Sequence, residues 1–162
     1  MNILFFLTPK SEVDYIYDDF TLRQAIEKMD YHGYTAVPIL DRDGRYVGTL
    51  AEGDILRVVK KEYDLDLKEA ESIFVTDIPK GRPVHSVHAR ARMEDLIERA
   101  ACQNFVPVVD DQEKFIGIIT RRDIILYCYK ELIKLQGQVA ALEETAAAKE
   151  DYARQTMEQD FR

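Results

Sequence analysis

The sequence predicts an α/β fold made of two copies of one strand–helix–strand–turn–strand–helix unit. A Val-Pro pair followed by two apolar residues and an Asp occurs at residues 37–41 and again at 106–110. Gly48 and Asp54 recur as Gly117 and Asp123 at the same constant offset. Self-similarity at a fixed offset indicates a repeated structural unit. Units of about 60 residues are marginally stable alone, so we expect the two copies to pack together as one body.

Local signals define the elements of the first copy in order. A short strand is expected at residues 13–16, and the side chain of Thr21 can cap a helix over residues 21–31. Apolar residues in that stretch follow the helical spacing i, i+3, i+4, i+7, and Gly33 ends it. The apolar run 36–40 predicts a strand buried on both faces. A turn at 41–44 leads to a strand at 46–51 and a helix at 54–63.

The second copy repeats this order after a polar connector. A short helix is possible within residues 65–74, followed by a strand near 84–87, a helix at 92–103, and strands at 105–109 and 115–119. We expect a first domain at residues 8–64, a connector at 65–82, a second domain at 83–130 and a C-terminal helix or tail at 131–162.

The helix that begins at Arg121 continues into the C-terminal segment. Apolar residues recur there at alternating steps of three and four, which is the spacing of a coiled-coil seam. These residues are Leu132, Leu135, Val139, Leu142 and Ala146. Gly137 and the end of the seam after Ala146 leave open a frayed or partner-bound tail.

Composition excludes several classes of function. The chain has 162 residues, no apolar run long enough to cross a membrane and no basic region before its apolar start, so we expect a cytoplasmic protein without membrane contact. A net charge of −8 argues against binding a nucleic-acid polymer. The two cysteines form no disulfide framework, and His85 and His88 lack further ligands, so no metal is expected. No catalytic motif is present, and we expect neither catalytic residues nor a cofactor.

The duplicated pattern resembles paired CBS domains, also known as a Bateman module, over residues of about 8 to 130. This resemblance implies tandem domains, two βαββα units packed pseudo-symmetrically, with a C-terminal helical extension. Residues 33–38, 76–79 and 119–122 are most similar to small stand-alone CBS proteins of Gram-positive bacteria. Those proteins bind cyclic di-AMP and regulate partner proteins.

The resemblance implies a nucleotide site between the copies. In CBS pairs the Asp of a Ser/Thr-x-x-Asp motif at a helix start binds the ribose hydroxyls, and Thr120 and Asp123 match this motif. Charge-assisted bonds from neighbouring arginines would hold phosphate. The remaining ligand-binding residues implied are Arg121, Arg122, Tyr34, Thr35, Ala36, Val13 and Phe105. The residues alone leave open a capping box at Thr120–Asp123, a solvated arginine pair and a Tyr34 that only packs.

A second, weaker cleft is expected at Asp54, Ile78 and Pro79. Ala51 stands where the motif requires Ser or Thr, so this cleft loses one polar contact. The loss of such a hydrogen bond changes binding by roughly 0.5–1.5 kcal/mol. We therefore expect one strong site and one weak or vacant site.

The resulting hypothesis is a non-catalytic regulatory sensor of adenine nucleotides. Cyclic di-AMP would bind between the repeats, and the protein would signal to an unidentified regulated protein. CBS pairs commonly associate, so a homodimer is expected. Two alternatives stay open: a sensor of AMP, ADP or ATP that reports energy state, and a ligand-free dimerisation scaffold whose working part is the C-terminal helix.

Overall fold

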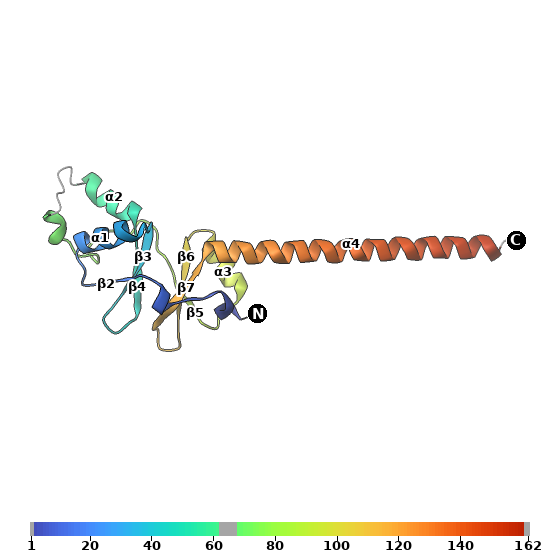
Figure 1. Ribbon diagram of the computed structural model, residues 1–162, viewed down its shortest axis with the longest axis horizontal. Coiled ribbons are helices and arrows are strands. Elements are labelled where there is room, and N and C mark those ends of the chain that lie inside the picture. Colours follow the sequence, from blue (N-terminus) through green and yellow to red (C-terminus); the bar gives the residue numbers. More distant parts are fainter. Residues whose placement is uncertain (1, 62–67, 161–162) are drawn as a thin grey trace. The chain divides into compact units, whose positions relative to one another are not determined.

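The computed structural model describes residues 2–61 and 68–160, with the backbone alone for 151–160. The chain divides into two compact units, Met1–Ile124 and Ile125–Arg162. The first unit contains both copies of the predicted repeat, and the second contains the greater part of the last helix (Figure 1). The predicted α/β class and the C-terminal helical extension are confirmed.

The first repeat forms a three-stranded sheet with two helices. The strand order is β2-β3-β4, with β2 parallel and β4 antiparallel to the central strand β3. The central strand is the continuous apolar run of the sequence, and four of its five residues are buried. The elements are β2 (Ile16–Tyr17), α1 (Leu22–His32), β3 (Ala36–Leu40), β4 (Tyr46–Ala51) and α2 (Glu52–Lys61).

Helix α1 begins and ends as its sequence predicts. The Thr21 side chain accepts a hydrogen bond from the Gln24 amide, and the Gln24 side chain accepts one from the Thr21 amide in return. Gly33 ends the helix in the left-handed conformation, at φ 67°. The first strand is shorter than predicted, because only Ile16 and Tyr17 pair with β3.

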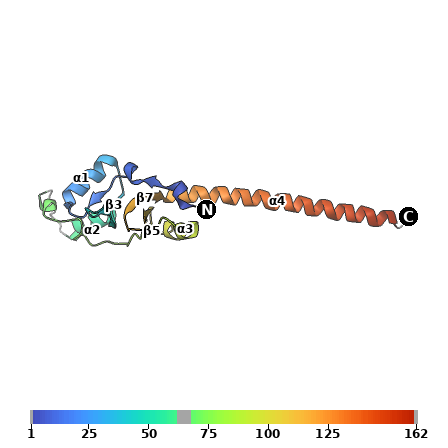
Figure 2. The same cartoon turned by 90° about the horizontal axis from the view of Figure 1, so that it is seen from below.

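The second repeat has the same topology. Its central strand β6 lies between β5 and β7, and all five of its residues are buried. Figure 2 shows α3 beside β5, as α1 and α2 accompany β3 in the first repeat. The elements are β5 (Val87–His88), α3 (Met93–Ala100), β6 (Phe105–Val109), β7 (Phe115–Thr120) and α4 (Arg121–Asp160). Only a 3-10 turn, Glu69–Glu71, occupies the described part of the connector before Phe74.

The strand registers show that the two repeats are structural copies. In the first hairpin Ala36 pairs with Ala51, and in the second Phe105 pairs with Thr120. Both hairpins also have a register shift before their last pair, between Ile39 and Leu40 and between Val108 and Val109. The register shift is therefore a feature that both repeats share.

The N-terminal segment joins the sheet of the second repeat, not the first. Strand β1 (Thr8–Pro9) pairs antiparallel with β7, with Thr8 opposite Ile118 and Pro9 opposite Gly117. The two repeats also meet at their hairpin turns, where the Phe115 amide donates to the Gly44 carbonyl at 2.9 Å. The rings of Tyr46 and Phe115 stack there with centroids 6.4 Å apart. These contacts hold both repeats in one compact unit.

Candidate functional site

Two clefts lie on either side of a shared wall made by Ala36, Asn104 and Phe105. Cleft A has a volume of about 250 Å³ and cleft B about 320 Å³. Cleft A is lined by Thr8, Glu12, Val13, Asp14, Tyr34, Ala36, Pro38, Asn104, Phe105, Ile118 and Thr120. Cleft B is lined by Ala36, Thr49, Ala51, Asp54, Arg57, Arg82, Val84, Cys102, Gln103, Asn104, Phe105 and Arg121. Each cleft draws side chains from both repeats.

Thr120, the first residue of the Thr-x-x-Asp motif, lines cleft A, whereas Asp123 is not among the residues that line either cleft. The Thr120 hydroxyl accepts a hydrogen bond from the Asp123 amide at 3.2 Å and donates to the Asp123 carboxylate oxygen Oδ2. The motif therefore caps the start of α4. Among the described residues no hydrogen bond or ion pair engages the other carboxylate oxygen, Oδ1 of Asp123. The cap thus leaves one oxygen available to accept a hydrogen bond from a ligand hydroxyl.

Tyr34 forms a fixed aromatic wall of cleft A. Its hydroxyl donates to Asp14 Oδ2 at 3.0 Å, and its ring stacks on His32 with centroids 5.3 Å apart. The bond to Asp14, with partial desolvation, raises the pKa of Tyr34. Asp14 also faces Lys28 Nζ and His32 Nδ1, each at 3.5 Å. The Asp14 charge is therefore compensated, and the tyrosine ring is held in place.

The other residues predicted for the main site do not all line cleft A. Val13, Ala36 and Phe105 line cleft A with Tyr34 and Thr120. Thr35 lines neither cleft, and its carbonyl accepts the first amide of α2, from Glu52, at 3.0 Å. Arg122 is exposed and lines neither cleft.

Arg121 lies in cleft B instead of cleft A. Its guanidinium Nε donates to the Gln103 carbonyl at 2.9 Å, which turns the side chain toward the segment before β6. The Arg121 amide donates to the Asn104 carbonyl at 3.0 Å. Glu52 makes the corresponding bond to Thr35 in the first repeat, so the start of both helices is anchored in the same way.

Asp54 in cleft B has the same place in its repeat as Asp123, but its carboxylate is already occupied. It is only 4% exposed and accepts hydrogen bonds from the Ala51 amide at 3.1 Å and the Gly81 amide at 2.8 Å. The Arg57 guanidinium adds an ion pair at 3.3 Å. Asp54 is therefore buried and engaged on both carboxylate oxygens, which leaves it less open to a ligand hydroxyl than Asp123.

Cleft B is the more cationic of the two. Arg57, Arg82 and Arg121 line it, against the single carboxylate of Asp54. The Arg57 guanidinium packs so closely on Gly81 that a Cβ there would lie 1.5 Å from Nη2. Glycine at position 81 therefore permits this arrangement.

The other two residues predicted for the second cleft do not line it. Ile78 is 3% exposed and belongs to the hydrophobic core of the first repeat, with Ile16, Leu22 and Val37. Pro79 is exposed in the connector. The connector reaches cleft B through Gly81 and Arg82 instead.

A half-buried tyrosine of the first repeat, Tyr46, contacts the second repeat. The Tyr46 hydroxyl shares a hydrogen bond with Thr49 Oγ1 at 2.8 Å and donates to the Val84 carbonyl at 2.9 Å. Burial raises the pKa of Tyr46 to about 12, although the bond to Thr49 acts in the opposite direction. As a neutral phenol, Tyr46 therefore links the first sheet to Val84, in the segment before β5.

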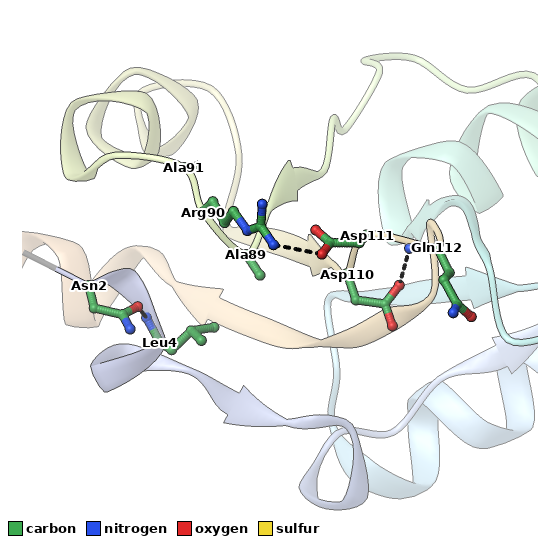
Figure 3. Close-up of a pocket in the computed structure, with 8 residues that line it drawn as sticks. All are labelled: Asn2, Leu4, Ala89, Arg90, Ala91, Asp110, Asp111 and Gln112. Atoms are coloured by element: carbon green, nitrogen blue, oxygen red, sulfur yellow. Dashed lines mark hydrogen bonds and ion pairs between the residues drawn. The ribbon is translucent and has the colours of Figure 1, made fainter.

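A further pocket, of about 600 Å³, opens on the second repeat away from both clefts (Figure 3). Arg90 pairs with Asp111 across it at 2.8 Å, and Asp110 accepts the amides of Gln112 and Lys114. These backbone bonds lower the pKa of Asp110. The charged groups drawn there are engaged with one another or with the turn, so this pocket is a poor candidate for an anionic ligand.

Several residues that line the clefts were not predicted from the sequence. Asn104 faces both clefts, and it has the place in the second repeat that Thr35 has in the first. The repeat offset could have found it. Arg57, Arg82 and Asp14 had no such signal, because segments distant in sequence bring them to the clefts.

The described residues include no helix that is both long and apolar enough to cross a membrane. They also contain no group of three or more His, Cys, Asp or Glu side chains placed to hold a metal ion. Cys102 and Cys128 are free thiols.

The repeated hairpins and the paired clefts define a tandem α/β module of the kind that binds small molecules between its copies. The chain belongs to the CBS domain family, whose pattern matches residues 7–61 and 75–130. It is 28% identical to the cyclic di-AMP receptor B of Bacillus subtilis (strain 168), over 80% of this chain and 84% of that protein.

Two other relatives are longer proteins that match this chain over only part of their length. The chain is 32% identical over 110 residues to a homoserine O-acetyltransferase of Methanohalophilus mahii. It is 26% identical over 111 residues to an inosine-5'-monophosphate dehydrogenase of Methanocaldococcus jannaschii. The matches span 21% and 20% of those two enzymes.

Solved structures share the fold. The crystal structure of CbpB in complex with c-di-AMP superposes with a TM-score of 0.70 at 22% identity, covering 85% of this chain and 91% of that one. The crystal structure of CBSX2 in complex with AMP gives 0.64 at 22% identity, covering 80% and 96%.

Proposed function

We propose that this protein is a non-catalytic sensor that binds an adenine nucleotide in cleft A and signals to a regulated protein. The carrying observation is that Thr120 lines cleft A with Tyr34 and Phe105 and is hydrogen-bonded to Asp123, whose Oδ1 the cap leaves available. A carboxylate accepts ribose hydroxyls, and aromatic faces pack against a base. Cleft A, at about 250 Å³, lies just below the range of roughly 300–1,000 Å³ that is typical of ligand pockets, so it would hold no more than one nucleoside.

Cyclic di-AMP is the nucleotide that we favour. The similarity to the B. subtilis cyclic di-AMP receptor B extends over most of both chains, and structural neighbours include CbpB with c-di-AMP. A cyclic dinucleotide would seat one nucleoside in cleft A and leave the other half outside. The AMP complex of CBSX2 supports AMP as the second candidate.

Cleft B is proposed as the weaker nucleoside site. Its aspartate already accepts three donors, and Ala51 supplies no hydroxyl. Its three arginines favour anionic groups, but ribose recognition there would cost the Asp54–Gly81 bond. The protein is further proposed to act in the cytoplasm and to associate with a second copy of itself.

Isothermal titration with cyclic di-AMP, AMP and ATP tests the proposal, with Asp123→Ala in parallel. The substitution keeps the backbone amide that Thr120 caps, so α4 should still begin at Arg121. Cyclic di-AMP binding that is lost in Asp123→Ala supports the proposal. Asp111→Ala, the same change in the pocket of Figure 3, is the matched control and should bind as the unmodified chain does.

Each other result has a defined meaning. Preferential binding of AMP or ATP, lost in Asp123→Ala, would replace the second-messenger assignment with an energy sensor. Binding that Asp123→Ala leaves unchanged would overturn the assignment to cleft A. If none of the three nucleotides binds, the sensor is excluded and a dimerisation scaffold is left.

A further inference from the structure

Helix α4 carries an apolar stripe with a continuous heptad spacing. The stripe starts two residues after Asp123 and proceeds by alternating steps of three and four. Its members are Ile125, Cys128, Leu132, Leu135, Val139, Leu142 and Ala146. We call these residues the seam. Ile125 and Cys128 extend the apolar repeat that began at Leu132 by one heptad toward Asp123.

The large apolar side chains of the seam are exposed to solvent. Leu132, Leu135, Val139 and Leu142 are 53%, 55%, 53% and 69% exposed. A helix in a protein gains most of its stability from packing its apolar face against other elements. A helix of 40 residues with this face exposed to water lacks that stabilisation. The spacing of the stripe identifies what covers it, because an apolar repeat of 3.5 residues matches a second helix wound around the first.

The residue types indicate a pair of parallel helices. With Ile125 as the first position of a heptad, the a positions hold Ile125, Leu132, Val139 and Ala146, and the d positions hold Cys128, Leu135 and Leu142. In parallel coiled coils, β-branched residues at a with leucine at d favour two strands, and Ile125, Val139, Leu135 and Leu142 fit this pattern. Gly137 takes position f, on the solvent side, so it weakens the helix without interrupting the seam.

The flanking positions agree with this arrangement. In a parallel pair, the g residue of one helix faces the e residue of the next heptad in its partner. Glu131 would face Gln136 of the second copy, and Gln138 would face Glu143. Both are carboxylate–amide pairs, so no like charges meet beside the seam.

We infer that α4 forms a parallel, in-register, two-stranded coiled coil with α4 of a second copy of this chain, through the seam. This inference specifies the self-association named in the proposed function and does not require nucleotide binding. Because α4 follows β7 directly, a parallel coil brings the second repeats of both copies to the same end of the coil.

Cysteine cross-linking tests the orientation. Leu135→Cys and Leu142→Cys are made separately in the full chain, with Cys102→Ser and Cys128→Ser to remove the native thiols. Mild oxidation should convert both variants to disulfide-linked dimers, because identical d positions face each other at every level of a parallel coil. Ala141→Cys, at a c position, is the control and should stay unlinked. Linkage of only one d variant, or of neither, would overturn the parallel arrangement.

Sedimentation equilibrium tests whether the seam is the dimer interface. Leu142→Asp should weaken dimerisation by roughly 100-fold or more, because it buries a charge in the seam. Ala141→Asp adds the same charge one residue away, off the seam, and should leave the dimer intact. A monomeric unmodified chain, or a Leu142→Asp variant as dimeric as the unmodified chain, would overturn the inference. Titrating both variants with cyclic di-AMP keeps the two proposals apart, since the coil inference leaves nucleotide affinity unchanged.

Discussion

Single polar groups decide what each cleft can accept. Asp123 and Asp54 have the same place in their repeats, yet one keeps an available carboxylate oxygen and the other is 4% exposed with three donors. Hydrogen bonds to a buried carboxylate stabilise it where it is, and they must be broken before a ligand can use it. Identical residues in a repeat can therefore differ in function because of their neighbours.

Tyr46 provides a residue-scale prediction about pH. Its pKa is raised from 10.0 to about 12 in the folded protein, so the neutral phenol stabilises the fold. This contribution is fully present below pH 10 and is lost as pH rises through about 12, with a total on the order of 2 kcal/mol. Urea unfolding between pH 9 and 12 should show this loss in the unmodified chain and not in Tyr46→Phe. Tyr31→Phe, at an 84% exposed position, is the control and should follow the unmodified chain.

The two hairpin turns differ at one backbone position. Gly44 and Glu113 occupy corresponding sites in the turns, and both have positive φ, 82° and 61°. A side chain in the left-handed region costs roughly 1–2 kcal/mol, partly offset by the greater freedom of glycine in the unfolded chain. The second repeat therefore carries a strained residue where the first does not.

A glycine exchange at the turns tests this difference. Glu113→Gly should raise the free energy of unfolding by about 0.5–1 kcal/mol, and Gly44→Ala should lower it by about 1 kcal/mol. Urea midpoints of both variants measure the effect. Shifts of the same sign for the two variants would contradict this explanation.

Strand β7 requires glycine at position 117, where β1 pairs with it. A Cβ at Gly117 would lie 2.1 Å from the Thr8 carbonyl oxygen, because β1 packs against this strand. At Gly48, the matching position of the first repeat, a Cβ meets nothing within 4 Å among the described residues. The requirement for glycine at position 117 therefore comes from the N-terminal strand.

Alanine substitutions at these two glycines should have different consequences. Gly117→Ala should destabilise the protein by about 1–3 kcal/mol and accelerate hydrogen exchange at Thr8, since β1 must move away. Gly48→Ala should be neutral or slightly stabilising. Urea unfolding with exchange mass spectrometry reports both effects, and equal destabilisation by the two changes would refute the explanation.

The two repeats share one interface in the molecule as a whole. Phe115 is 2% exposed, its ring stacks on Tyr46, and its amide bonds to Gly44 of the other hairpin. Phe115→Ala should therefore destabilise both repeats together, by about 3–5 kcal/mol, in one unfolding transition. Phe5→Ala, at an 83% exposed position, should change stability by less than about 0.5 kcal/mol. A two-step melt of Phe115→Ala followed by circular dichroism, with one step unchanged, would show that the repeats unfold independently.

The duplicated unit, the class of fold and the bounds of the central strands could be predicted from the sequence, whereas β2, β5, α2 and α3 differ from their predicted bounds by two or more residues at one end or both. Strands β3 and β4 and strand β6 have their predicted bounds, and α1 ends at Gly33, because apolar runs, caps and turn residues act over a few neighbouring positions. The sequence also identified the Thr120–Asp123 motif and the heptad seam, which are local patterns. Three contacts at the clefts could not be predicted from the sequence. Arg121 turns toward cleft B, Gly81 and Arg57 engage the Asp54 carboxylate, and Asp14 accepts the Tyr34 hydroxyl. Those contacts join distant segments, and their geometry depends on how the two repeats pack.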